Sequence, residues 1–216
     1  MNISVVIAAV VSFIVTAVMG KYLIPYLIKL KYGQTILEIG PSWHKNKQGT
    51  PTMGGLMFII GIIAAVFVGV ITMLIFGEGK KGNYNLNNLK LFSGLVMALL
   101  FGALGFLDDY VKVVKKRNLG LTAKQKMLFQ ILIAVVYLLI NFIGGDRNTW
   151  VYFPFIASVN FGFLYYPFAI FLIVGFVNAV NLTDGIDGLA ATVTFVVGTF
   201  MLFIASILNI TSMGVL

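Results

Sequence analysis

The chain alternates long apolar runs with short polar segments, and the lengths of these runs define the expected elements. A helix of about 20 residues crosses a hydrocarbon layer of about 30 Å. Strands of about ten alternating residues, as in outer-membrane barrels, do not fit runs of this length. The pattern therefore predicts an all-α polytopic membrane bundle of six transmembrane helices, at 3–28, 53–76, 89–107, 127–143, 164–182 and 189–210.

The composition agrees with this interpretation, because 60% of the residues are hydrophobic and only 10% are charged. Such values are typical of integral membrane proteins. Cysteine is absent, which excludes disulfides and thiolate metal sites. The first run lacks a basic start and outlasts a signal-peptide core, so we expect a retained span. We expect one multi-pass transmembrane domain over 1–216, with no nucleic-acid partner.

Basic residues gather in two polar segments. Ten of the 15 Lys and Arg residues lie after the first and third runs. Because loops rich in Lys and Arg remain cytoplasmic, we expect the N-terminus outside and cytoplasmic loops near 29–52, 108–126 and 183–188. The net charge of +8 also attracts polyanions and anionic lipid headgroups, although topology alone explains any single lysine.

Four of the seven acidic residues stand in two groups at the ends of apolar runs. Asp108 and Asp109 close the third run, and Asp184 and Asp187 follow the fifth. A carboxylate in hydrocarbon costs roughly 2.5 to 3.5 kcal/mol at a helix centre and less near the interface. Both groups fall on the predicted cytoplasmic face, so we expect them to converge there for phosphate and metal chemistry.

A polar stripe precedes the second acidic group. Asn178, Asn181 and Asp184 are each three residues apart, which places them on one helix face, and Asp187 follows three further on. Gly185 permits a close backbone approach or a break in the helix. A short turn between two helices also uses Asn, Asp and Gly, and this conformational alternative stays open.

Adjacent positions on a helix point about 100° apart, so Asp108 and Asp109 suit different roles better than joint chelation of one ion. One suits proton acceptance, and the other suits orienting a lysine or contacting a metal-bound phosphate. Lys112 lies at i+4 from Asp108, and a simple helix-stabilising ion pair also explains it.

The segment before the second run contains Thr50-Pro51-Thr52-Met53-Gly54-Gly55, a turn into a helix. We expect Thr50 or Thr52 to cap this helix, and its first amides to hold an anion beside Lys47. His44 is the only histidine and makes no metal site by itself. The aromatic stretch 150–157 predicts either a short outer hairpin or an interfacial belt.

Four motifs together resemble one family. The DDY at 108–110 and the NLTDGIDGL at 181–189 resemble marks of the polyprenyl-phosphate N-acetylhexosamine-1-phosphate transferases. The GTPTMGG at 49–55 and the LTAKQK at 121–126 are similar to those of its phospho-N-acetylmuramoyl-pentapeptide transferase (MraY) branch.

The resemblance implies a Mg²⁺-dependent phospho-glycosyl transferase of the bacterial cytoplasmic membrane, with its active site on the cytoplasmic face. Such an enzyme transfers phospho-MurNAc-pentapeptide from UDP-MurNAc-pentapeptide to undecaprenyl phosphate, forming lipid I and UMP for peptidoglycan, and hence for cell wall growth and division. By the same similarity the catalytic residues are Asp108, as base towards the lipid phosphate, Asp109 and Asp184. The implied substrate-binding residues are Lys47, Thr52, Lys112, Lys124, Asn178, Asn181, Gly185 and Asp187.

Family members continue beyond the position that corresponds to Leu216. The continuation holds a third aspartate that resembles the principal metal ligand, an aromatic that stacks on uracil and a histidine-rich loop. We therefore expect residues 1–216 to be the N-terminal portion of the enzyme and to be inactive alone.

Three alternatives stay open. A related transferase that uses UDP-GlcNAc would share most of these motifs. An ion-coupled transporter would place its polar groups near mid-membrane rather than at span ends, and a scaffold would need no acidic stripe. Oligomeric state is also open, since small residues along the third run permit packing within the chain or in a homodimer; they are Gly94, Ala98, Gly102 and Gly105.

Overall fold

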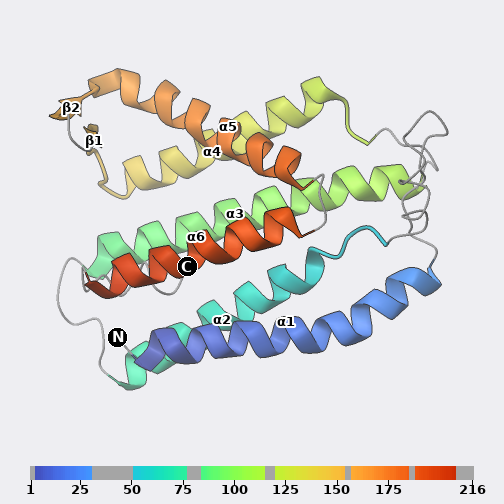
Figure 1. Ribbon diagram of the computed structural model, residues 1–216. Helices are drawn as coiled ribbons and strands as arrows, with labels where there is room; N and C mark the ends of the chain where they lie inside the picture. The colour runs from blue at the N-terminus through green and yellow to red at the C-terminus, as the bar shows by residue number, and fades with distance from the viewer. Residues whose placement is uncertain are drawn as a thin grey trace. The chain divides into compact units, whose positions relative to one another are not determined.

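The computed structural model describes residues 3–30, 51–76, 84–114, 120–153, 157–184 and 188–207, which are mainly helical (Figure 1). These residues confirm the all-α membrane fold predicted from the apolar runs. In chain order the elements are α1 (Ile3–Lys29), α2 (Leu56–Ile75), α3 (Tyr84–Val114), α4 (Ala123–Ile143), β1 (Trp150–Phe153), β2 (Ala157–Asn160), the 3₁₀ helix η2 (Gly162–Leu164), α5 (Tyr165–Thr183) and α6 (Leu189–Ile207).

The helices follow the predicted spans, although several boundaries differ: α2 begins at Leu56 rather than at residue 53, and α3 begins at Tyr84 rather than at residue 89. α3 continues through the acidic pair to Val114, and α4 begins at Ala123 rather than at residue 127. Within the described ranges, five helices are long and apolar enough to cross a membrane. The apolar part of α6, Leu189–Ile204, is shorter. The sixth span and the outward N-terminus therefore stay predictions.

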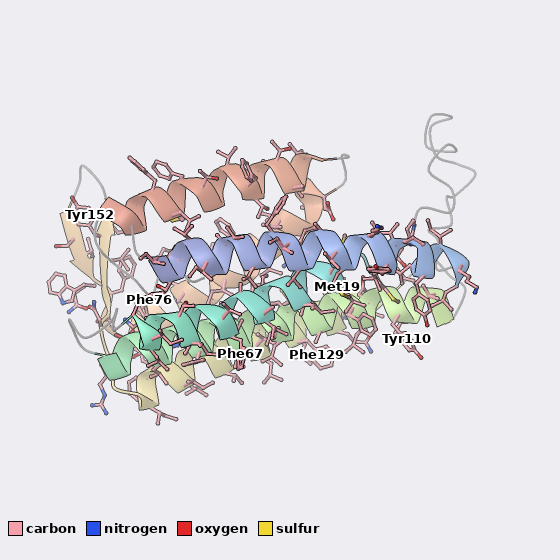
Figure 2. The ribbon with its side chains drawn as sticks, turned by 90° about the horizontal axis from the view of Figure 1, so that it is seen from below. Met19, Phe67, Phe76, Tyr110, Phe129 and Tyr152 are labelled. Atoms are coloured by element: carbon pink, nitrogen blue, oxygen red, sulfur yellow. The ribbon has the colours of Figure 1, made fainter. Side chains whose placement is uncertain are left out.

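Large apolar side chains cover the outer surfaces of these helices. Phe67 on α2 and Phe129 on α4 are exposed and project from their helices (Figure 2). Contiguous exposed apolar surface is rare on soluble monomers, whereas in a bilayer such side chains contact lipid. The surface therefore supports the membrane assignment independently of helix length.

The structure divides into two compact units, which we describe separately. The first contains the described residues of 1–80 and 99–126, and the second those of 81–98 and 127–214. In the first unit α1 and α2 lie side by side (Figure 1). In the second unit polar contacts connect α4 to α3 and to α5. The prediction of a single domain stays a prediction.

Small residues allow the close approach of α1 and α2. Gly61, Ala65 and Gly69 are buried and four residues apart on α2, which places them on one face. A Cβ added at Gly61 would meet the Thr16 hydroxyl and would lie 3.2 Å from the carbonyl oxygen of Ser12, both on α1. The contact therefore requires glycine at position 61.

Gly102, one of the small residues expected to permit helix packing along α3, lies against α2 of the same chain. A Cβ at Gly102 would lie 2.9 Å from Ile59 Cδ1 on α2, whereas nothing lies within 4 Å of such an atom at Gly94 or Gly105. Gly102 therefore permits the approach of α2 to α3 in the first unit. The homodimer stays a prediction.

Polar contacts join one end of α3 to α4 in the second unit. The Ser93 hydroxyl donates to Asn141 Oδ1 at 3.2 Å, and both residues are buried. Asn141 Nδ2 donates to the Tyr137 carbonyl at 2.8 Å, and Lys90 Nζ lies 2.7 Å from an Asp146 carboxylate oxygen. A buried polar group without a partner costs about 1 to 3 kcal/mol, so these contacts favour one arrangement of the two helices.

The segment after α4 forms an antiparallel hairpin, which confirms the hairpin interpretation of the aromatic stretch. Trp150 of β1 pairs with Asn160 of β2. The Asn160 side-chain oxygen accepts from the Thr149 hydroxyl at 2.7 Å and from the Gly162 N–H at 2.9 Å. Gly162 has φ +51°, a left-handed conformation that glycine adopts at low cost, and the chain then enters α5.

We predict that Gly61→Ala lowers the stability of the protein in detergent by about 1 to 3 kcal/mol, because the new methyl group overpacks the α1–α2 contact. The measurement is the midpoint of thermal unfolding. Gly198→Ala on α6 is the control, since nothing lies within 4 Å of a Cβ there. Equal midpoints for Gly61→Ala and the unchanged protein would refute the assigned role of Gly61.

Candidate functional site

Asp108 and Asp109 share one cation near the end of α3. Lys112 Nζ lies 2.8 Å from Asp108 Oδ2 and 2.9 Å from Asp109 Oδ1. The predicted i,i+4 pair is thus confirmed, but it is half of a larger cluster. Although adjacent helical positions diverge, the long lysine side chain reaches both carboxylates. Two negative charges and one positive charge leave a net charge of −1.

The start of the next segment holds the second oxygen of Asp108. The Leu121 N–H donates to Asp108 Oδ1 at 2.8 Å. A Cβ at Gly120 would lie 2.7 Å from the Asp108 carbonyl oxygen and 2.8 Å from its Cγ, so this approach requires glycine. Side-chain exposure is 13% for Asp108 and 33% for Asp109, which makes Asp109 the more accessible carboxylate.

A capping box begins α4 inside the LTAKQK motif. The Thr122 N–H donates to Gln125 Oε1 at 3.1 Å, and the Gln125 N–H donates to Thr122 Oγ1 at 3.3 Å. The reciprocal Thr-x-x-Gln pattern satisfies amides that an unpaired helix start leaves free. The Thr-x-x-Gln spacing also indicates this helix start in the sequence, although the LTAKQK motif was predicted to matter only through the family resemblance.

The capping box places two lysines near the start of α4. Lys124 and Lys126 oppose the positive end of the helix dipole, so they weaken the helix slightly rather than stabilise it. Lys126 also attracts the Asp108 carboxylate over a longer distance. Anions are favoured where lysines and free helix amides combine. Contact between Lys124 and a phosphate stays a prediction.

The turn before α2 differs from the expectation. Thr52 is half-buried, but α2 begins at Leu56 and its N-cap is Gly55, which makes no side-chain cap. The N-cap is therefore Gly55 and not Thr52 as expected, because the helix begins three residues further along the chain. Met53 is buried with φ +67°, a left-handed conformation that sequence reasoning missed and that costs a non-glycine residue of order 1 to 3 kcal/mol. Lys47 and Thr50 lie outside the described residues.

The second predicted group lies at the end of α5. Asn178 is half-buried and Asn181 is exposed, while Asp184 occupies the C-cap position and is exposed. Gly185 and Asp187 lie outside the described residues. Because Asp184 belongs to the second unit and the Asp108 cluster to the first, convergence of the two groups stays a prediction.

The donor chemistry of the Asp108 cluster fits part of a magnesium site. Mg²⁺ prefers oxygen ligands and is commonly held by one or two carboxylates together with substrate phosphates. Over the described ranges, no group of three or more His, Cys, Asp or Glu residues is placed to hold a metal ion. Any Mg²⁺ held by the carboxylates of these ranges would take its remaining ligands from other oxygen donors, such as water or substrate phosphates.

Comparison with known proteins identifies relatives across the chain. The model described as Glycosyl transferase family 4 matches residues 91–216, which is more than half of the chain. The Phospho-N-acetylmuramoyl-pentapeptide-transferase signature 1 matches residues 47–59, which include Thr52 and Met53.

Three curated relatives are named phospho-N-acetylmuramoyl-pentapeptide-transferase. The protein of Caldanaerobacter subterraneus is 44% identical over 212 residues, which cover 98% of this chain and 62% of the relative. The Heliobacterium modesticaldum protein is 47% identical over 201 residues, covering 92% and 58%. The Clostridium perfringens protein is 42% identical over 200 residues, covering 91% and 57%.

The chain thus spans about three fifths of the length of these relatives. The matched regions include the motifs on which the resemblance rested. Both acidic groups lie within the family match, and the glycine-rich turn lies within the signature. On this basis the chain belongs to the glycosyl transferase family 4.

Proposed function

We propose that the protein, at its full natural length, transfers phospho-MurNAc-pentapeptide from UDP-MurNAc-pentapeptide to undecaprenyl phosphate, forming lipid I and UMP. The names of the relatives and the matched signature support this choice of substrates. The structural observation that carries the proposal is the Asp108–Lys112–Asp109 cluster at the end of an apolar helix. There, a phosphate anchored by a lipid tail can meet a water-soluble nucleotide sugar.

The reaction requires compensation of negative charge more than proton removal. An oxygen of the lipid phosphate attacks the β-phosphorus of the nucleotide sugar, and the bond from that phosphorus to the UMP oxygen breaks. A phosphate monoester has a second pKa of about 6, so the attacking oxygen is largely ionised at neutral pH. Positioning and electrostatic stabilisation then dominate catalysis.

Lys112 supplies this compensation as a shared counter-ion. An arriving phosphate competes with both carboxylates for its ammonium group. When Lys112 turns to the phosphate, it releases Asp108 Oδ2 and Asp109 Oδ1, while the Leu121 N–H still holds Asp108 Oδ1. The base role that the family resemblance assigns to Asp108 would use the released Oδ2.

We propose Mg²⁺ as the cofactor, with Asp109 as the most accessible described carboxylate of the first unit to help hold it. When bound, Mg²⁺ neutralises charge on the diphosphate. The proposed location is the cytoplasmic face of the bacterial cytoplasmic membrane, where the basic segments and the acidic cluster coincide.

The proposed activity predicts UMP release and lipid I formation when the full-length protein is incubated with UDP-MurNAc-pentapeptide, undecaprenyl phosphate and Mg²⁺. Chromatography of the nucleotide and lipid products measures both, and chelation of Mg²⁺ should abolish them. UDP-GlcNAc is the competing substrate. A GlcNAc product without lipid I would favour the related transferase, and no transfer from either donor would reject both.

We predict that Lys112→Met lowers transfer by about 10²-fold or more, since it removes the cation that the two carboxylates share. Lys90→Met is the matched control, because Lys90 lies on the same helix and also pairs with an aspartate, Asp146. Initial rates of UMP release measure both variants. Equal rates for the two would mean that the cluster has only a structural role.

We predict that Gly120→Ala lowers transfer by about tenfold to a hundredfold, because its methyl group displaces Asp108. Gly105→Ala on α3 is the control, as nothing lies within 4 Å of a Cβ there. Initial rates of lipid I formation measure both variants, and unfolding midpoints show whether each remains folded. Full activity of Gly120→Ala would contradict the described packing of Asp108.

A further inference from the structure

Two side-chain amides pair between α4 and α5 in the second unit. Gln130 on α4 is 1% exposed. Its Nε2 donates to Asn178 Oδ1 at 3.3 Å, and Asn178 Nδ2 donates to Gln130 Oε1 at 2.8 Å. A buried amide within a membrane helix is costly unless it is hydrogen-bonded. The reciprocal pair gives each of the two amides a hydrogen-bond partner.

A third contact determines which way the two amides face. Asn178 Nδ2 also donates to the Val174 carbonyl at 2.9 Å. A backbone carbonyl only accepts hydrogen bonds, so the Asn178 atom beside it must be the nitrogen. The Gln130 atom that faces this nitrogen must then be its oxygen. The orientation of the pair therefore follows from the backbone of α5.

This orientation limits what Asn178 offers to a ligand. An amide nitrogen carries two hydrogens, and Gln130 and Val174 accept both. The oxygen has two lone pairs, of which Gln130 uses one. Among the residues that the structure describes, the contacts of half-buried Asn178 thus leave one acceptor position unused. A phosphate oxygen, itself an acceptor, has no favourable contact with it.

We propose that Gln130 is a positioning residue that restricts Asn178 to accepting a hydrogen bond from an N–H or O–H group of the nucleotide sugar. The proposal rests on the transferase activity proposed above, which supplies that substrate. In this proposal Asn178 contacts an N–H or O–H group of the substrate, whereas the positively charged lysines contact its phosphates. Gln130 acts through Asn178 and contacts no reacting atom itself.

The test is steady-state kinetics of the full-length enzyme with UDP-MurNAc-pentapeptide as the varied substrate. Gln130→Met keeps the side-chain length but removes the amide, so KM should rise about tenfold with little change in kcat. Gln130→Glu should restore part of the affinity, since a carboxyl oxygen can still accept from Asn178 Nδ2. If Gln130→Met does not fold, Gln130→Asn replaces it, because its amide is one methylene too short to reach.

A double-variant cycle separates positioning from general stability. Asn178→Leu removes the acceptor, and adding Gln130→Met to it should worsen KM no further, because the two residues act as one unit. Asn141→Leu is the matched control, as it removes another buried amide of α4 that pairs with α3. It should lower the unfolding midpoint but leave KM unchanged.

Three results would overturn the proposal. The first is an unchanged KM in folded Gln130→Met. The second is a KM in the double variant that rises by the product of the two single effects. The third is a Gln130→Met variant that differs only in the Mg²⁺ concentration needed for activity. An unchanged KM in both the Gln130 and the Asn178 variants, beside a Lys112→Met variant with little or no transfer, would reject this inference and leave the transferase proposal standing. Absence of lipid I synthesis by the unchanged enzyme would instead reject the transferase proposal.

Discussion

Charge compensation at the edge of the hydrocarbon layer is the constraint on which this site depends. Two adjacent carboxylates end an apolar helix, and a single ammonium, that of Lys112, lies within 2.9 Å of both. Without this cation the two like charges would repel one another at the edge of the apolar stretch. The backbone N–H of Leu121 completes the arrangement, and the absence of a side chain at Gly120 makes room for it.

α4 makes two separate side-chain hydrogen-bond contacts with neighbouring helices in the second unit. Its middle carries the amide of Gln130, which orients Asn178, and its far end carries the amide of Asn141, which pairs with Ser93. Hydrophobic contact alone does not select one rotation of a helix in lipid, because lipid tails are as apolar as Leu. Directional hydrogen bonds therefore select the rotation of α4.

The sequence predicted those features that depend on local spacing. Run lengths located the helices, and the four-residue separation of Asp108 and Lys112 predicted their ion pair. Contacts between distant residues were not predictable: Gln130 and Asn178 are 48 positions apart, and nothing in either neighbourhood marks the other. The left-handed backbone conformation of Met53 was not predicted, because methionine, unlike the adjacent glycines, is not a residue typical of turns.

α3 carries an ion pair towards each end of its apolar stretch. From Lys90 to Asp108 the helix advances 18 residues, about 27 Å at roughly 1.5 Å per residue, which is close to the hydrocarbon thickness of about 30 Å. Sliding this helix towards either leaflet would draw a charged pair into the lipid. The spacing between the two ion pairs is fixed by the helix, whereas the thickness of the bilayer is not. The depth of Asp108 and Asp109 relative to the lipid headgroups therefore depends on the thickness of the membrane.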